Sequence, residues 1–154
     1  GASVSTVEHL LAALSALGVD DVEVSLDGPE VPILDGSAAR WVEYIRRAGL
    51  VAEARRRRVL VVEQAVTVRD GDRWARLEPA PALELVAFVD FRHPALPAGT
   101  RRYVASPDAF VRELASARTF GFARDVAAMH ARGLALGGSL ANAVLLDDAV
   151  DFGL

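Results

Sequence analysis

The chain has 154 residues, of which 52% are hydrophobic and 25% are charged, a composition typical of a folded protein rather than a disordered one. Its net charge of −4 argues against a general nucleic-acid-binding role, and its length suits one ordinary domain or two small ones. The sequence has no cysteine, no apolar run of 18 residues and no signal-peptide pattern, so we expect a cytoplasmic protein without disulfides, thiolate metal sites or a membrane span.

The first predicted helix covers residues 6–17. Ser5 or Thr6 is a suitable N-cap, and Glu8 lies within reach of a capping box. Gly18 follows the last helical residue, as a C′ glycine does. Apolar residues recur with a helical period, which predicts one buried stripe: Leu10, Leu11, Leu14 and Leu17.

Glu8 and His9 place a carboxylate and an imidazole at the N-terminal end of this helix, where both can face a cleft. A carboxylate base beside a metal-bound water is one use of such a pair. The alternative is that Glu8 only caps the helix and His9 is an ordinary surface residue. The dipeptide alone does not separate these interpretations.

The rest of the first half alternates loops with two predicted elements. Residues 22–26 alternate as a half-buried strand does. A proline-bracketed loop then ends at Asp35-Gly36, and Ser37 begins a second helix that ends near Gly49. The arginine run at 55–58 is interpreted as a solvated linker, with a phosphate-binding patch as the alternative.

The second half opens with strands. Residues 59–68 are rich in β-branched side chains, Asp70-Gly71 is typical of a hairpin turn, and residues 74–77 alternate on the way back. Residues 83–91 and 101–105 predict two more strands.

Helices and one short strand follow. Ser106 is the expected cap of a helix with Pro107 at its first position. A further helix is predicted over residues 124–132, ended by Gly133, before a buried strand near 144–146.

This order of elements favours an α+β fold of two-layer sandwiches rather than an alternating βαβ fold. We predict a first domain over 1–54, a linker over 55–58 and a second domain over 59–154. A single strand cannot form a sheet, so we expect the strand at 22–26 to pair with residues outside this sequence or with a partner.

Other polar groups each have an ordinary structural interpretation. His93 precedes a proline and His130 lies near a helix end, so both are expected to be structural or surface residues. Gly137-Gly138-Ser139 is either an anion cradle or a simple turn. Asp147-Asp148 is either a metal site or loop solvation. The sequence contains no His-x-His or His-x₃-His pair that would predict a local zinc site.

Five motifs occur in a characteristic order: Thr6-Val7-Glu8-His9-Leu10, Glu30-Val31-Pro32-Ile33-Leu34-Asp35-Gly36-Ser37, Asp90-Phe91-Arg92-His93-Pro94, Ala117-Arg118-Thr119-Phe120-Gly121-Phe122 and Gly133-Leu134-Ala135-Leu136-Gly137-Gly138-Ser139. In this order the chain resembles, from residue 5 to 154, the UDP-3-O-acyl-N-acetylglucosamine deacetylases known as LpxC. These are the zinc enzymes of the committed step of lipid A synthesis in Gram-negative bacteria. The resemblance implies two sandwich domains, the first incomplete and the second truncated here, with the active site between them.

The resemblance also implies a mechanism in which zinc-activated water removes the N-acetyl group. Glu8 matches the general base and His9 matches the first of three zinc ligands. Thr119 matches the residue that stabilises the oxyanion, and Asp35 matches an acidic residue near the active centre.

The implied partner is an acylated UDP-amino-sugar, bound by a monomer in the complete protein, without nucleic acid. Asp90, Phe91 and Arg73 match positions near the UDP moiety. The positions matched to the acyl-chain passage are Phe120, Val126, Gly138 and Ser139, with Asp125 beside them.

The departures from the family pattern lie at both ends. The resemblance places the other two zinc ligands, in a His-x-x-x-Asp motif, and the general-acid histidine beyond Leu154, and places further strands of the first domain before Gly1. We therefore expect an internal piece of a deacetylase that binds zinc weakly and is marginally stable. The alternatives are an inactive remnant that binds a sugar nucleotide or a partner through Phe91 and the 137–139 loop, and a generic α+β domain.

Overall fold

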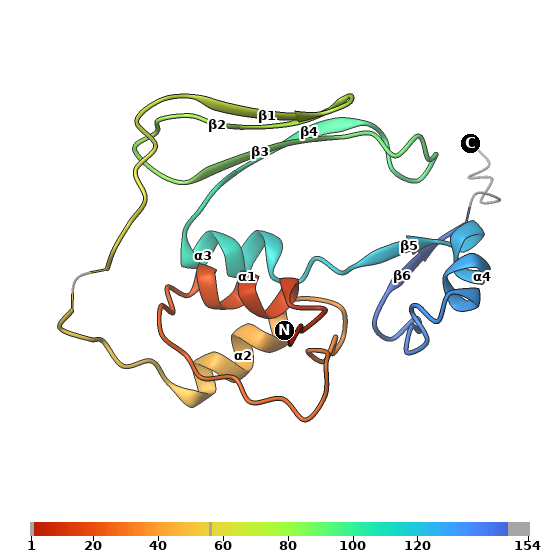
Figure 1. The fold of residues 1–154 in the computed structure, drawn as a ribbon, viewed down its shortest axis with the longest axis horizontal. Coiled ribbons are helices and arrows are strands. Elements are labelled where there is room, and N and C mark those ends of the chain that lie inside the picture. The colour runs from red at the N-terminus through yellow and green to blue at the C-terminus, as the bar shows by residue number, and fades with distance from the viewer. Residues whose placement is uncertain (1, 56, 148–154) are drawn as a thin grey trace.

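The structure, a computed structural model, describes residues 2–55 and 57–147 (Figure 1). Asp148, half of the predicted acidic pair, lies outside the described residues. The elements follow in this order: α1 (Glu8–Ala16), α2 (Ala39–Ala48), β1 (Val66–Asp70), β2 (Arg73–Leu77), β3 (Glu84–Val89), β4 (Gly99–Val104), α3 (Pro107–Ala109), the π-helix η1 (Phe110–Leu114), β5 (Phe120–Phe122), α4 (Ala123–Ala131) and β6 (Val144–Leu146).

The strands form small two-stranded sheets. β1 pairs with β2 and β3 pairs with β4, both antiparallel, whereas β5 pairs with β6 in parallel. In Figure 1 both hairpins are drawn above α1 and α3, and β5, β6 and α4 gather at one side. Helices mixed with small sheets confirm the α+β class, while the division into two sandwich domains stays a prediction.

The main core joins the two halves of the sequence. Ala13 of α1 and Val42 of α2 pack with Phe110 and Ala115, which lie at the start of η1 and just after its end. A second cluster of Leu10, Leu14 and Val31 adjoins the first, and both pack against Trp41 and Ile45 of α2. The apolar stripe of α1 is therefore buried between α2 and the helix that follows β4, although Leu11 stays 55% exposed.

The end of α1 follows the sequence prediction. Gly18 has φ +72°, and its N–H donates to the carbonyl oxygen of Ser15 at 3.1 Å. The N–H of Val19 donates to Leu14 at 2.9 Å, which completes a Schellman motif. Gly133 ends α4 in the same way, with φ +72° and the N–H of Leu134 bonded to Met129 at 2.9 Å.

The predicted N-cap of α1 is wrong. The helix begins at Glu8 with Val7 as its N-cap, and no side chain caps it. Thr6 has φ +55°, and its hydroxyl donates to the Glu30 carboxylate instead. Ser5 forms a bridge with Glu30 through backbone bonds. Tertiary bonds to the 29–31 loop thus replace the local capping bonds.

Two predicted strands are absent or shorter in the described residues. Residues 22–26 form no strand, since they pair with no other described segment. Of the predicted strand at 59–68, only the part from Val66 onward is paired, since β2 ends opposite Val66 at Leu77. The hairpin turn comprises Gly71-Asp72 rather than Asp70-Gly71, with Gly71 at φ +57°.

The predicted start of the helix after β4 is confirmed. The Ser106 hydroxyl accepts the N–H of Ala109 at 3.1 Å, and Pro107 occupies the first turn. The helix then widens into η1, where the N–H of Ala115 donates to Phe110 at 2.8 Å. This π-helical turn brings Ala115 into the core.

The arginine run has no regular structure where it is described, and two of its side chains are already paired. Arg55 binds Asp21 and Arg57 binds Asp20, each at 2.6 Å. These exposed pairs favour a solvated linker over a phosphate-binding patch, because their guanidinium groups already have anionic partners. No helix in the described part of the chain is both long and apolar enough to cross a bilayer.

Candidate active site

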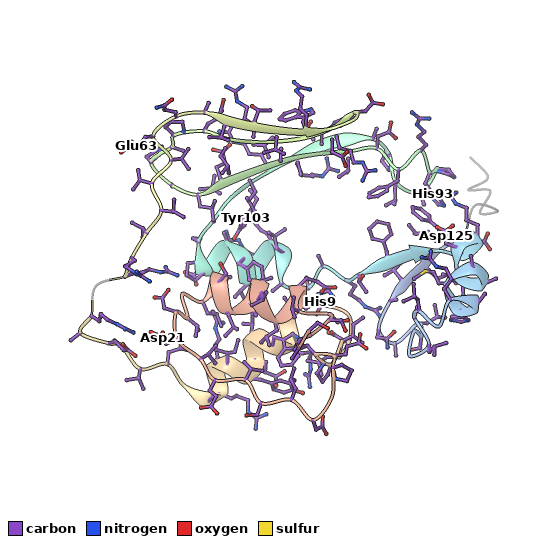
Figure 2. The ribbon with its side chains drawn as sticks, viewed as in Figure 1. His9, Asp21, Glu63, His93, Tyr103 and Asp125 are labelled. Carbon is purple, nitrogen blue, oxygen red and sulfur yellow. The ribbon has the colours of Figure 1, made fainter. Side chains whose placement is uncertain are left out.

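The Glu8–His9 pair lies at the start of α1, as Figure 2 shows for His9. Glu8 is 66% exposed, whereas the His9 side chain is only 14% exposed. The His9 Nε2 atom lies 3.8 Å from a Glu8 carboxylate oxygen, too far for a hydrogen bond. Among the described residues this nitrogen is buried without any hydrogen-bond partner. The pair therefore combines an accessible carboxylate with a shielded, uncommitted imidazole nitrogen.

An uncommitted buried nitrogen is unfavourable unless something binds it, because burial removes its hydrogen bonds to water. A metal ligand has this arrangement, since the ligating nitrogen must be neutral and unbonded before the metal arrives. However, the described residues contain no cluster of three or more His, Cys, Asp or Glu side chains that could hold a metal ion. His9 fits one ligand position, and the described residues do not complete a zinc site.

Asp35 lies in the turn before α2 and organises the start of that helix. Its Oδ1 atom accepts bonds from the Ser37 backbone N–H at 3.1 Å and from the Ser37 hydroxyl at 2.9 Å. The Ser37 oxygen in turn accepts the N–H of Ala39 at 3.2 Å. The side chain that the resemblance places near the active centre thus has a definite structural task in the described structure.

Thr119 contacts this same turn. Its backbone N–H donates to the carbonyl oxygen of Gly36 at 2.8 Å, and its own carbonyl accepts the N–H of Val144 at 2.9 Å. A Cβ atom on Gly36 would overlap the carbonyl oxygen of Asn142 and lie 3.3 Å from the Thr119 methyl carbon. The structure therefore brings the Asp35 turn and the residue before β5, Thr119, into contact although they are far apart in sequence.

An aromatic cluster forms where β5 begins. The rings of Phe91 and Phe120 meet edge to face at 5.2 Å, and Phe122 lies within 6.0 Å of both. The ring of the buried His93 lies 5.3 Å from that of Phe122. Phe91 and Phe120 remain 41% and 40% exposed. Phe91, which is predicted to lie near the UDP moiety, is thus in contact with Phe120, which is predicted to line the acyl-chain passage.

The remaining predicted substrate residues lie around or away from this cluster. Asp90 is exposed, and its Oδ1 atom accepts the N–H of Arg92 at 2.9 Å. Asp125 is exposed in the first turn of α4, and Val126 beside it is half-buried. Arg73 is exposed in the β1–β2 hairpin opposite Asp70, and the described contacts do not connect it with the cluster.

Gly138 and Ser139 lie in an exposed loop whose shape depends on Asn142. The Asn142 Oδ1 atom accepts the Ser139 N–H at 2.8 Å, and its Nδ2 donates to the carbonyl oxygen of Gly137 at 2.9 Å. The loop is therefore a defined turn with an internal amide brace. The amide brace accounts for the turn.

Arg118, Phe122 and Asn142 were not predicted as site residues. Arg118 donates from Nε to the carbonyl oxygen of Asp35 at 2.8 Å and from Nη2 to that of Leu140 at 3.0 Å. The only hint of its role in the sequence is its position next to Thr119. A pattern of residue types does not reveal bonds to backbone carbonyl groups that are distant in the sequence.

Comparison of the sequence with known proteins shows its family. The family model described as LpxC, UDP-3-O-acyl N-acetylglycosamine deacetylase, matches residues 1–151. A UDP-3-O-acyl-N-acetylglucosamine deacetylase of Anaeromyxobacter sp. (strain Fw109-5) is 51% identical over 147 residues, which are 96% of this chain and 48% of the relative. Similarly named proteins of Sodalis glossinidius and Pasteurella multocida are 47% and 45% identical, over 94% and 96% of this chain.

The chain spans about half the length of these curated relatives, 48% or 49% of each. The family match covers nearly every residue, including all five motifs from Thr6 to Ser139. The chain belongs to the LpxC family of UDP-3-O-acyl N-acetylglycosamine deacetylases.

Proposed function

We propose that this chain forms part of a zinc-dependent deacetylase that removes the N-acetyl group of UDP-3-O-acyl-N-acetylglucosamine in lipid A synthesis. The observation that carries the proposal is the pair at the start of α1: the exposed Glu8 carboxylate beside the buried, uncommitted Nε2 of His9. The names of the relatives at 45–51% identity support the substrate class.

His9 Nε2 would be one zinc ligand, with the others supplied from outside the described residues. Zinc, when bound, would supply a water of lowered pKa and polarise the amide carbonyl. Glu8 then accepts the proton of the attacking water, a task that suits an exposed carboxylate without a salt-bridge partner other than His9 among the described residues. The Thr119 hydroxyl donates a hydrogen bond to the amide oxygen as negative charge develops there.

The test uses a grafted protein, in which this chain replaces the matching half of the Anaeromyxobacter relative. We expect the grafted protein to release acetate from the acylated UDP-amino-sugar, and Glu8→Gln to lower kcat by about 100-fold or more. Glu43→Gln is the matched control, because Glu43 is an exposed carboxylate on α2 that pairs with Arg40. A folded grafted protein in which Glu8→Gln and Glu43→Gln are equally active would contradict the proposal.

A second candidate is a binding remnant without chemistry, favoured by the half-exposed aromatic cluster and by the lack of a metal-binding cluster among the described residues. Phe91 is 41% exposed, so part of its ring is available to contact a uracil base. UDP titrated into the 154-residue protein should then shift the signals of Phe91 and Phe120, and Phe91→Ala should abolish the shift. If UDP binds without any turnover in the grafted protein, this second candidate replaces the first.

A further inference from the structure

Arg118 joins three segments that are distant in sequence. The residue is half-buried, and its guanidinium reaches Asp35 in the turn before α2 and Leu140 in the loop before β6. Both acceptors are backbone carbonyl oxygens. The side chain therefore fixes the course of the main chain at both sites, whichever residues occupy them.

The two bonds require the shape of an arginine. Nε and Nη2 belong to one planar group and point in different directions, so one side chain binds two carbonyl oxygens at once. A lysine carries a single nitrogen at the end of a flexible stem and cannot reproduce this fork. The charge also strengthens both bonds relative to neutral donors.

The residue after Arg118 is held by backbone bonds to the same two segments. The Thr119 N–H binds Gly36, next to Asp35, and the Thr119 carbonyl binds Val144, shortly after Leu140. Gly36 is packed so closely against Asn142 that no side chain fits there. Arg118 and these contacts together form the Arg118 junction, which consists of Asp35, Gly36, Arg118, Thr119, Leu140 and Asn142.

We infer that Arg118 is a positioning residue for deacetylation: it sets the location of the Thr119 hydroxyl relative to the Asp35 turn and the 137–142 loop. The inference rests on the proposed function, because Thr119 is the oxyanion donor only in that reaction. A donor must lie within about half an ångström of its productive place, and a displacement of about 1 Å can cost about 100-fold in rate.

The kinetic test compares Arg118→Ala, Thr119→Ala and the double variant in the grafted protein. We expect Arg118→Ala to lower kcat by about 10- to 100-fold while KM changes by less than about threefold. In the Thr119→Ala background the same change should cost less than about threefold, because the donor it positions is already gone. The inference would be overturned if the fold-losses in kcat of the two single variants multiply in the double variant. It would also be overturned if Arg118→Ala changes KM but not kcat.

Two further variants separate positioning from general damage. Arg118→Lys should have a kcat between those of Arg118→Ala and the unsubstituted protein, because a lysine can bind one of the two carbonyl oxygens. Arg112→Ala is the matched control, because Arg112 lies on η1 nearby, is 67% exposed and pairs only with Glu113 among the described contacts. Arg112→Ala should leave kcat and KM unchanged. An equal effect of Arg112→Ala and Arg118→Ala would overturn the inference.

A spectral measurement distinguishes failure of this inference from failure of the proposed function. In the grafted protein, Arg118→Ala should shift the amide resonances of Gly36, Thr119 and Val144 while that of Asp70 in the β1–β2 hairpin stays in place. If Thr119→Ala keeps full activity, the oxyanion assignment fails, and shifts at these three amides then establish only that Arg118 fixes the junction. Unchanged amides would overturn the inference whatever the kinetics.

Discussion

The backbone N–H of Thr119 donates to the carbonyl oxygen of Gly36 at 2.8 Å, which sets the proposed oxyanion donor directly against the turn that carries Asp35. The contact is possible because Gly36 has no side chain: a Cβ there would overlap the backbone of Asn142. Three segments of the chain thus meet at one glycine. We therefore expect even small substitutions around it to lower the stability of the protein markedly.

Gly36→Ala should destabilise the protein strongly. Gly36 has φ +81°, which costs an L-residue about 1–2 kcal/mol, and overpacking against Asn142 should add about 1–3 kcal/mol. Gly18→Ala is the matched control, because Gly18 has φ +72° but nothing within 4 Å of the added carbon. Thermal unfolding of the two grafted variants measures the difference, and equal melting temperatures would show that the close approach at Gly36 is unimportant.

Ser37→Ala should cost about 1–3 kcal/mol of stability. Ser37 is only 1% exposed, and its hydroxyl links the Asp35 carboxylate to the N–H of Ala39 at the start of α2. Removing it leaves the part-buried N–H of Ala39 without its acceptor. Ser15→Ala on the exposed face of α1 should be nearly neutral, and similar unfolding curves for the two variants would count against the Asp35–Ser37 link.

The 154-residue protein should hold zinc weakly. His9 offers one imidazole nitrogen, whereas a catalytic zinc site has about three protein ligands, and the described residues contain no cluster of three. Metal analysis after dialysis against a weak chelator should therefore find well under one zinc per chain. Stoichiometric zinc that disappears in His9→Ala would refute this expectation.

The same protein should unfold over a broad range at low temperature and bind anilinonaphthalene sulfonate. Large apolar side chains of the hairpins lie in solvent, with Val68, Trp74 and Phe88 exposed by 66%, 62% and 69%. Such exposed apolar surface is unusual for a stable monomer. A sharp, high-temperature transition in a monomeric sample that does not bind the dye would contradict this prediction.

Local signals in the sequence predicted the elements whose causes are local. Gly18 and Gly133 end helices because each adopts a positive φ, and Ser106 begins one because its hydroxyl reaches the N–H of Ala109. The β1–β2 hairpin needs only the two strands and a glycine in its turn. These features depend on residues within a few positions of one another.

The predictions that are wrong concern elements whose structure depends on residues distant in the sequence. Thr6 has a better partner in Glu30 than in the helix it was expected to cap, and residues 22–26 alternate correctly but have no neighbouring strand in the described residues. The site shows a similar contrast. Motif resemblance predicts Glu8, His9 and Thr119 as site residues. Arg118 instead binds the carbonyl oxygens of Asp35 and Leu140, and no pattern of residue types encodes those bonds.

The most direct test of the central claim, that Glu8 is a proton acceptor and His9 a zinc ligand, measures zinc content and kcat together in the grafted protein. Glu8→Gln should keep one zinc per chain and lose about 100-fold or more of kcat, because only the base is removed. His9→Ala should lose both zinc and activity. Variants that retain both the metal and the rate would show that the pair at the start of α1 does not carry the chemistry.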